Sequence, residues 1–386
     1  MRWIKRLVIV LLSICCVVAL VFAAALTDPS RYTSLDLALL PCEQGDSPVF
    51  FRAVEFKQDG SPAYRNQIRD LLERLNDSPP VTDLVFFIHG WNKNPTSAEG
   101  DYQNFLCRLH ASLRRVIGAQ KRAGGLLVVG VFWPSTITNE SREPTILMPV
   151  SYYPIRNRAA VIAENGLAPL LASLPIHQAQ ERNGLPVRLQ LIGHSFGARM
   201  LVRALERLSS DGTLAPLLRS AGETNIALLN AAIAPEQFEW LTRAVANAKR
   251  SGSPARFTDE TNSYFFNLHS FNDGANRFLF RLASVADDDP FSCAAGACGV
   301  PQYATMCVDG SGETTLKGVG VTDSIPGEAI NAWNIDTSAI VFDHGDIYKG
   351  RVVSLIADLL YGAAKTTWSH QVPSRSTLSR CRKPLK

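Results

Sequence analysis

Ser195 stands in a pattern that can make a hydroxyl reactive. It is the middle residue of Gly193-His194-Ser195-Phe196-Gly197, a G-x-S-x-G sequence. The surrounding segment, residues 187–208, begins with apolar residues of β character and ends with apolar residues at helical spacing. It therefore predicts a strand, a sharp turn and a helix. Such a turn holds its serine at strained dihedrals above the sheet edge, and Gly193 and Gly197 let neighbouring backbone pass closely. Ser195 is thus a candidate nucleophile; the alternative is a glycine-rich turn that contains a serine by chance.

This segment resembles the nucleophile elbow of the α/β-hydrolase superfamily, and the longer matches resemble its lipase- and esterase-like bacterial branch. The resemblance covers roughly residues 49–364, apart from a cysteine-rich stretch at 287–324. It implies an α/β-hydrolase fold, a serine hydrolase activity, and neither a metal nor an organic cofactor.

A second motif follows the continuous apolar run at residues 84–88, which predicts a strand buried on both faces. The run ends in His89-Gly90-Trp91. The resemblance implies that this turn supports an oxyanion hole, with the backbone amides of Trp91 and Phe196 as donors. Each such donor contributes roughly 3–4 kcal/mol in the transition state. Gly90 permits the turn, and His89 is expected to be structural rather than the base.

A serine nucleophile needs a base, and the base needs a carboxylate to fix its tautomer. The resemblance implies the chain order serine, acid, histidine. Three histidines follow Ser195: His269 within a predicted strand, His344 in a loop before the last predicted helix, and His370 in the tail. The position of His344 is the one in which the superfamily places its base, so His344 is assigned that role.

Asp273 is the candidate acid because it lies in an Asn-Asp-Gly turn after the strand predicted at 264–270. The same turn also favours an aspartate that only caps it. Asp343 and Asp346 are close neighbours of His344 in sequence. A carboxylate so near in the chain seldom reaches the far nitrogen of the His344 ring. Glu236, after the preceding strand, is the reserve candidate.

The rest of the chain alternates between segments with the apolar pattern of strands and segments with the apolar spacing of helices. Strands are predicted at residues 49–56, 84–88, 126–133, 225–232 and 264–270, in addition to the strand before Ser195, and helices at 61–75, 96–116, 155–174, 235–248 and 351–364. This alternation predicts a mostly parallel sheet covered on both faces, with functional loops at the carboxyl ends of its strands. His89-Gly90-Trp91, Ser195 and Asp273 all fall at such ends.

An irregular loop is expected at residues 134–154. Its Tyr152 and Tyr153 are candidates for a cap or an acyl-pocket wall, with surface packing as the alternative. A proline- and glutamine-containing loop is expected to lead from the next helix into the strand before Ser195.

The amino terminus has the pattern of an export signal. Arg2, Lys5 and Arg6 precede an apolar run at residues 7–26, long enough to span a bilayer, and a small-residue cleavage site lies near its end. Residues 1–26 are therefore a signal peptide or a retained signal-anchor, residues 27–48 a linker, and residues 49–364 the catalytic domain. Both alternatives place that domain outside the cytoplasm, anchored to a membrane or free after cleavage.

Six cysteines follow the apolar run: Cys42, Cys107, Cys293, Cys298, Cys307 and Cys381. In an exported domain they predict disulfides, with at least one local bridge in residues 287–324, interpreted as a surface insertion. A metal site is disfavoured because no C-x-x-C sequence or nearby histidine accompanies them. Residues 365–386 form a basic tail.

These features predict a hydrolase of carboxylic esters or thioesters, with a small-molecule or lipid acyl substrate and a membrane contact if residues 1–26 are retained. A net charge of +4 over 386 residues and the lack of a basic-aromatic stripe argue against nucleic-acid binding. Peptidases and acyltransferases use the same fold, and the sequence does not separate them. The rival from another class is a non-catalytic, hydrolase-like envelope scaffold.

Overall fold

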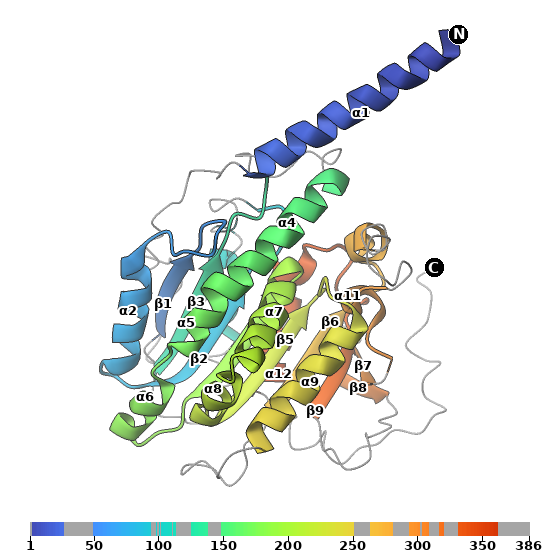
Figure 1. The fold of residues 1–386 in the computed structure, drawn as a ribbon. Coiled ribbons are helices and arrows are strands. Elements are labelled where there is room, and N and C mark those ends of the chain that lie inside the picture. The colour runs from blue at the N-terminus through green and yellow to red at the C-terminus, as the bar shows by residue number, and fades with distance from the viewer. Residues whose placement is uncertain are drawn as a thin grey trace.

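The computed structural model describes residues 2–26, 49–93, 98–112 (without 99, 101 and 110), 125–137, 148–250, 263–280, 293–308 (without 302), 316–319 and 331–361. The predicted linker, the basic tail and His370 lie outside them. A nine-stranded sheet has the order β1-β3-β2-β4-β5-β6-β9-β7-β8. Its neighbouring strands are parallel except for the pair β7 and β8 (Figure 1). The predicted α/β class and mostly parallel sheet are confirmed.

The strands are β1 (Val49–Glu55), β2 (Val81–Ile88), β3 (Gly125–Phe132), β4 (Arg188–His194), β5 (Glu223–Leu229), β6 (Ser263–His269), β7 (Ala304–Val308), β8 (Leu316–Val319) and β9 (Asn331–Asp336). The helices are α1 (Arg2–Leu26), α2 (Arg65–Asn76), α4 (Met148–Ile162), α5 (Ala168–Ala172), α6 (Ile176–Asn183), α7 (Phe196–Ser210), α8 (Leu214–Ser220), α9 (Pro235–Arg250), α11 (Ala295–Cys298) and α12 (Gly350–Tyr361). Shorter turns are η2 (Ala163–Leu167), η3 (Ala275–Leu279) and η4 (Asp346–Tyr348).

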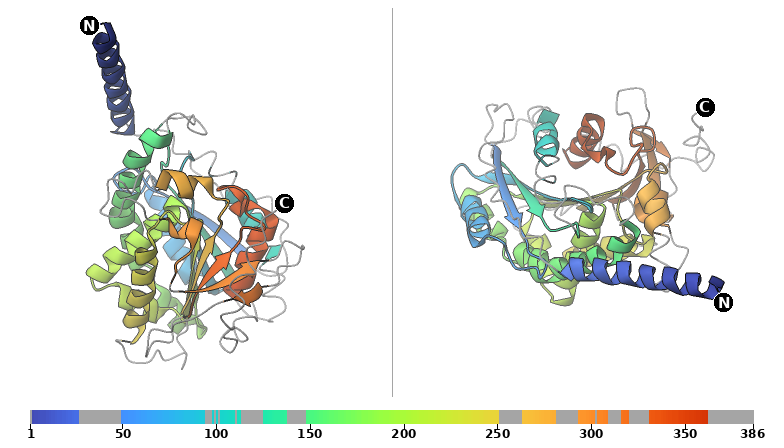
Figure 2. Two further views of the ribbon diagram at one scale, coloured as in Figure 1. Left: turned by 90° about the vertical axis from the view of Figure 1, so that its right-hand side faces the viewer. Right: turned by 90° about the horizontal axis from the view of Figure 1, so that it is seen from above.

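Strand β2 shows why its sequence is a continuous apolar run. Leu84 and Phe86 belong to one hydrophobic core, whereas Val85 and Phe87 belong to a second core on the opposite face of the sheet. All four side chains are buried. Because successive side chains in a strand point to opposite faces, both faces must be covered by other elements. Viewed from above, α2, α4, α7 and α9 cover one face, and α12 with the helical residues of 98–112 cover the other (Figure 2).

Several helical segments differ from the sequence-based prediction, among them α8, which was not predicted. Helix α4 begins at Met148, inside the expected loop at 134–154. The helix predicted at 155–174 is interrupted by η2, where Gly166 packs so closely on Phe56 that a Cβ would lie 2.7 Å from its ring. Helix α6 occupies an expected loop, because Ile176, Ala179 and Gln180 recur on one face and are buried.

The cysteine-rich segment is more closely integrated into the fold than the surface insertion we expected. It contributes α11 and adds β7 and β8 to one edge of the sheet. Ala295 and Ala297 of α11 are fully buried. Buried Asn334 of β9 accepts the Val300 amide hydrogen at 2.9 Å and donates to the Val300 carbonyl at 2.7 Å. Small residues and glycines in this segment allow close packing against the strands, although their low hydrophobicity hides it.

Disulfides are present, as the sequence predicts. Cys293 and Cys298 form the expected local bridge, with Cα atoms 6.0 Å apart. Cys107 and Cys307 are also disulfide-bonded, whereas Cys15 and Cys16 are free. Disulfides persist in oxidising compartments, so they indicate an extracytoplasmic environment.

Helix α1 extends away from the body of the protein (Figures 1 and 2). A different stretch, Ser151–Asn183, is long and apolar enough to cross a membrane by composition alone. Since 56% of that window is buried inside the protein, it is a core segment of the domain.

Candidate active site

Ser195 lies on a sharp turn between β4, which ends at His194, and α7, which begins at Phe196. Its backbone dihedrals are φ 53° and ψ −119°, in the left-handed half of the map that a residue with a side chain rarely adopts. The turn is held at both ends. The Ser195 amide donates to the Leu229 carbonyl at 2.9 Å, and the Ser195 carbonyl accepts from the Ala198 amide at 3.1 Å. The predicted strand, turn and helix are therefore present, with the strain at the serine.

Three side chains from distant parts of the chain form one hydrogen-bonded line. His344 Nε2 lies 2.7 Å from Ser195 Oγ, and His344 Nδ1 lies 2.8 Å from Asp273 Oδ2. A carboxylate only accepts, so Nδ1–H donates to Asp273, and the unprotonated Nε2 accepts the serine hydroxyl hydrogen. Asp273 is fully buried, and the His344 side chain is 21% exposed. The structure thus brings together the three residues predicted from the sequence.

Asp273 is positioned by Asn276, at the start of η3. The Asn276 amide donates to Asp273 Oδ1 at 3.0 Å, and its side-chain Nδ2 donates to Asp273 Oδ2 at 2.8 Å. The same Nδ2 donates to the Asn230 carbonyl at 2.6 Å. Both carboxylate oxygens therefore have fixed donors in addition to His344, which sets the orientation of the carboxylate.

The backbone carbonyl of His344 accepts hydrogen bonds from two polar residues. His194 Nε2 lies 3.1 Å from the His344 carbonyl and donates to it, and Asn230 Nδ2 donates to the same oxygen at 3.3 Å. The imidazole rings of His194 and His344 lie 4.9 Å apart between centroids. Asn230 directly follows β5 and has a positive φ of 45°. Together these contacts fix the loop that carries His344.

The two histidines have opposite pKa shifts. Burial lowers the pKa of His344, but the charge and hydrogen bond of Asp273 and the charge of Asp343 raise it overall above its ordinary value. Burial, and then the nearby His344, hold the pKa of His194 well below its ordinary value. His194 therefore stays neutral as a hydrogen-bond donor, while His344 can accept a proton.

The predicted oxyanion residues lie beside Ser195. A Cβ on Gly90 would lie 2.9 Å from the Ser195 Cβ, so only glycine allows this turn to approach the nucleophile. The Trp91 ring centroid is 5.8 Å from that of Phe196. Phe196 is the first residue of α7, so its amide has no carbonyl partner within the helix. Trp91 and Phe196, the residues predicted to supply the two oxyanion amides, therefore lie at the Ser195 turn.

His89 is a structural residue, in agreement with its expected role. The Trp133 amide donates to His89 Nε2 at 3.2 Å, so His89 Nδ1–H donates to the Gly90 carbonyl at 2.9 Å. The Trp133 indole also donates to the His89 carbonyl, at 2.9 Å. These bonds fasten the His-Gly-Trp turn to the end of β3.

Tyr152 of α4 forms an aromatic cluster with the predicted oxyanion residues. Its ring centroid lies 5.7 Å from that of Trp91 and 5.0 Å from that of Phe196. Since Tyr152 is 5% exposed, it packs inside the protein rather than on its surface. This cluster joins the His-Gly-Trp turn to the first residue of α7.

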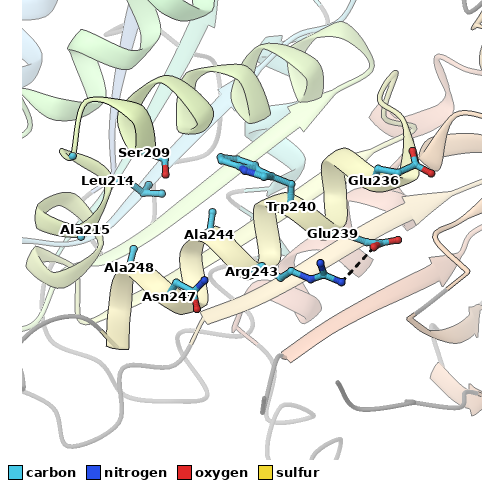
Figure 3. A pocket seen from close by; sticks show the side chains of 11 residues that line it. Ser209, Leu214, Ala215, Glu236, Glu239, Trp240, Arg243, Ala244, Asn247 and Ala248 are labelled. Atoms are coloured by element: carbon cyan, nitrogen blue, oxygen red, sulfur yellow. Dashed lines mark ion pairs between the residues drawn. The ribbon is translucent and has the colours of Figure 1, made fainter. Parts of the chain in front are cut away.

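The alternative acids occupy other positions. Asp343 accepts the backbone amide hydrogen of His344 at 2.7 Å, and Asp346 pairs with Lys349 at 2.8 Å. Glu236, at the start of α9, lines a pocket of about 640 Å³ between α8 and α9 (Figure 3). His269 is buried at the end of β6 beside Phe271, with a ring distance of 5.3 Å.

Sequence reasoning did not identify His194, Asn230 and Asn276 as parts of the site. Asn276 stands three residues after Asp273 at the start of a helical turn, and this Asp-x-x-Asn spacing was its only visible signal. His194 and Asn230 act on a loop more than a hundred residues away, so local spacing carries no trace of their role.

Replacing Asn276 with alanine should lower kcat by about tenfold, because Asp273 loses a side-chain donor that orients it toward His344. Stability should fall by about 1–3 kcal/mol, since the Asn230 carbonyl also loses a buried partner. Ester kinetics and urea unfolding measure both effects. Asn272→Ala is the matched control, because Asn272 lies in the same turn but donates to Ser338 and Val341. Equal kinetics for the two variants would contradict the positioning role.

No protein-family model, curated protein or solved structure matches this chain. Among the described residues, no group of three or more histidine, cysteine, aspartate or glutamate side chains is placed to hold a metal ion.

Proposed function

We propose that this protein is a serine hydrolase of the α/β-hydrolase fold that cleaves carboxylic esters or thioesters. The observation that carries the proposal is the continuous line from Ser195 Oγ through both His344 nitrogens to buried Asp273. Nucleophile, base and orienting acid stand in the geometry that acyl transfer requires.

In the proposed reaction, Ser195 Oγ attacks the acyl carbonyl carbon while His344 Nε2 takes the hydroxyl proton. The amides of Trp91 and Phe196 hold the carbonyl oxygen as it becomes negative. The bond from carbon to the leaving oxygen or sulfur then breaks, and His344 gives its proton to that atom. A water molecule next attacks the acyl-enzyme with His344 again as base, releasing the acid and restoring Ser195. Asp273 keeps Nδ1 protonated throughout and stabilises the imidazolium.

A fluorophosphonate probe tests the nucleophile directly, because it phosphonylates an activated serine. We expect the native protein to be labelled at Ser195, and Ser195→Ala to remain unlabelled. The matched control is Ser209→Ala, which removes an exposed serine at the far end of α7 and should leave labelling unchanged. Absence of labelling in folded native protein would favour a non-catalytic scaffold instead.

The pH profile should report His344. The base must be neutral to accept the proton, and its pKa lies above that of an ordinary histidine, about 6.5. Hydrolysis should therefore begin to fall at a pH above that value as the solution is acidified. Asp273→Asn removes the main group that raises this pKa, so its residual activity should persist to lower pH than that of the native protein. Measuring kcat/KM of both proteins between pH 4 and 9 checks the two predictions. A native rate that stays flat to about pH 4 would exclude a histidine base.

A further inference from the structure

Helix α1 has an apolar surface on every side. The consecutive residues Leu7, Val8, Ile9, Val10, Leu11 and Leu12 are all between 47% and 62% exposed. Successive residues of a helix point about 100° apart, so this run covers the whole circumference and no side of it is packed against the domain. Its 25 residues span roughly 38 Å, more than the bilayer core of about 30 Å.

The position of α1 relative to the candidate site is informative. The helix contacts α4, and it extends away from the domain beyond the ends toward which the parallel strands point (Figures 1 and 2). The first turns of α4 carry Tyr152, which packs on Trp91 and Phe196. The end of α1 that joins the domain and the Ser195 turn therefore lie at the same edge of the sheet.

A second apolar feature lies at this edge. Phe342 is 55% exposed and stands two residues before His344. Among the described residues outside α1, the exposed large hydrophobic side chains are Phe342 and Val161. Lys349 Nζ lies 6.0 Å from the Phe342 ring centroid, and its side chain is 58% exposed. An exposed apolar ring with a lysine beside it suits the boundary between lipid tails and headgroups.

We propose that α1 is retained as a membrane anchor and that the Ser195 edge of the domain faces the bilayer. The enzyme then takes its substrate from the membrane that holds it: a lipid ester with a long acyl chain, whose carbonyl lies at headgroup level. The basic residues at the far end of α1, Arg2, Lys5 and Arg6, place the domain on the outer side. This inference rests on the proposed function.

The experiment reconstitutes the full chain in liposomes and compares two presentations of a fluorogenic long-chain lipid ester. The ester is placed either in the same vesicles as the protein or in a separate vesicle population, and a water-soluble short-chain ester is measured in parallel. We expect hydrolysis in the same vesicles to exceed hydrolysis in separate vesicles by at least about tenfold, because the anchor raises the local concentration of lipid substrate. The intact mass of the membrane-bound protein should include α1.

Two variants separate the role of Phe342 from general damage. Phe342→Ser should lower the ratio of lipid-ester rate to soluble-ester rate about tenfold, since a buried phenyl ring contributes that much to association. Val161→Ser removes a comparably exposed apolar side chain from α4 and should leave both rates unchanged. Equal rates for the two vesicle arrangements, cleavage of α1, or equal ratios in both variants would overturn this inference alone. Failure to hydrolyse the soluble ester as well would overturn the proposed function with it.

Discussion

Replacing His344 with alanine should lower kcat/KM for a short-chain ester by about 10⁴–10⁶-fold. The imidazole is the group placed to take the Ser195 proton, with its Nε2 at 2.7 Å from Oγ. A serine hydroxyl without a base is a weak nucleophile at neutral pH. The residual rate should reflect the oxyanion amides and substrate binding alone. Steady-state kinetics on the purified variant measures the loss.

The matched control is His177→Ala. His177 is an exposed histidine on α6, 3.4 Å from Glu181, and its loss should leave kcat/KM within about twofold of the native value because surface pairs of this kind contribute little. A His344→Ala variant that kept a substantial part of the native rate would mean that another group accepts the serine proton.

Double replacement gives a sharper result than either single change. In the proposed mechanism Ser195 and His344 act as one unit, so Ser195→Ala combined with His344→Ala should lose little more activity than Ser195→Ala alone. Multiplicative losses would indicate that the two side chains work independently, in contradiction to the hydrogen bond between them. This comparison also guards against a general loss of folding, which would add to the effect of any further change.

The site residues predictable from the sequence are those whose positions follow from strand ends. Ser195 follows a short apolar strand, and Asp273 follows another, so the parallel sheet brings both to one edge. The assignment of His344 also required the expected chain order of serine, acid and histidine. By contrast, the donors to the His344 carbonyl come from residues 150 and 114 positions away, and nothing in their local sequence indicates that contact.

The same reasoning explains which parts of the fold were predictable. The central strands are continuous apolar runs because helices cover both faces, and such runs can be recognised in isolation. Strands β7 and β8 were missed because they lie at an edge of the sheet, where Thr305 and Lys317 interrupt the apolar pattern. Their assignment depends on pairing with β9, a contact with residues distant in sequence. Strand β9 was missed because asparagines separate its few apolar residues.

Replacing Gly197 with alanine should lower kcat/KM by about 10²-fold or more, with a lower melting temperature. A Cβ at this position would lie 2.2 Å from the Ile88 carbonyl oxygen and 2.5 Å from the His89 carbonyl oxygen. Both atoms are backbone at the end of β2, so neither can rotate away as a side chain would. Relief requires α7 to separate from β2, which moves Ser195 away from the turn that carries the Trp91 amide.

Kinetics and thermal unfolding of Gly197→Ala should therefore be compared with those of Gly100→Ala. Gly100 lies in a helical segment where a Cβ would meet nothing within 4 Å, so that variant should keep native activity and melt at or slightly above the native temperature. A folded Gly197→Ala protein with native kinetics would mean that catalysis tolerates displacement of the Ser195 turn from β2. Such a result would contradict the proposed oxyanion role of the Trp91 amide, which depends on the close packing of α7 on β2.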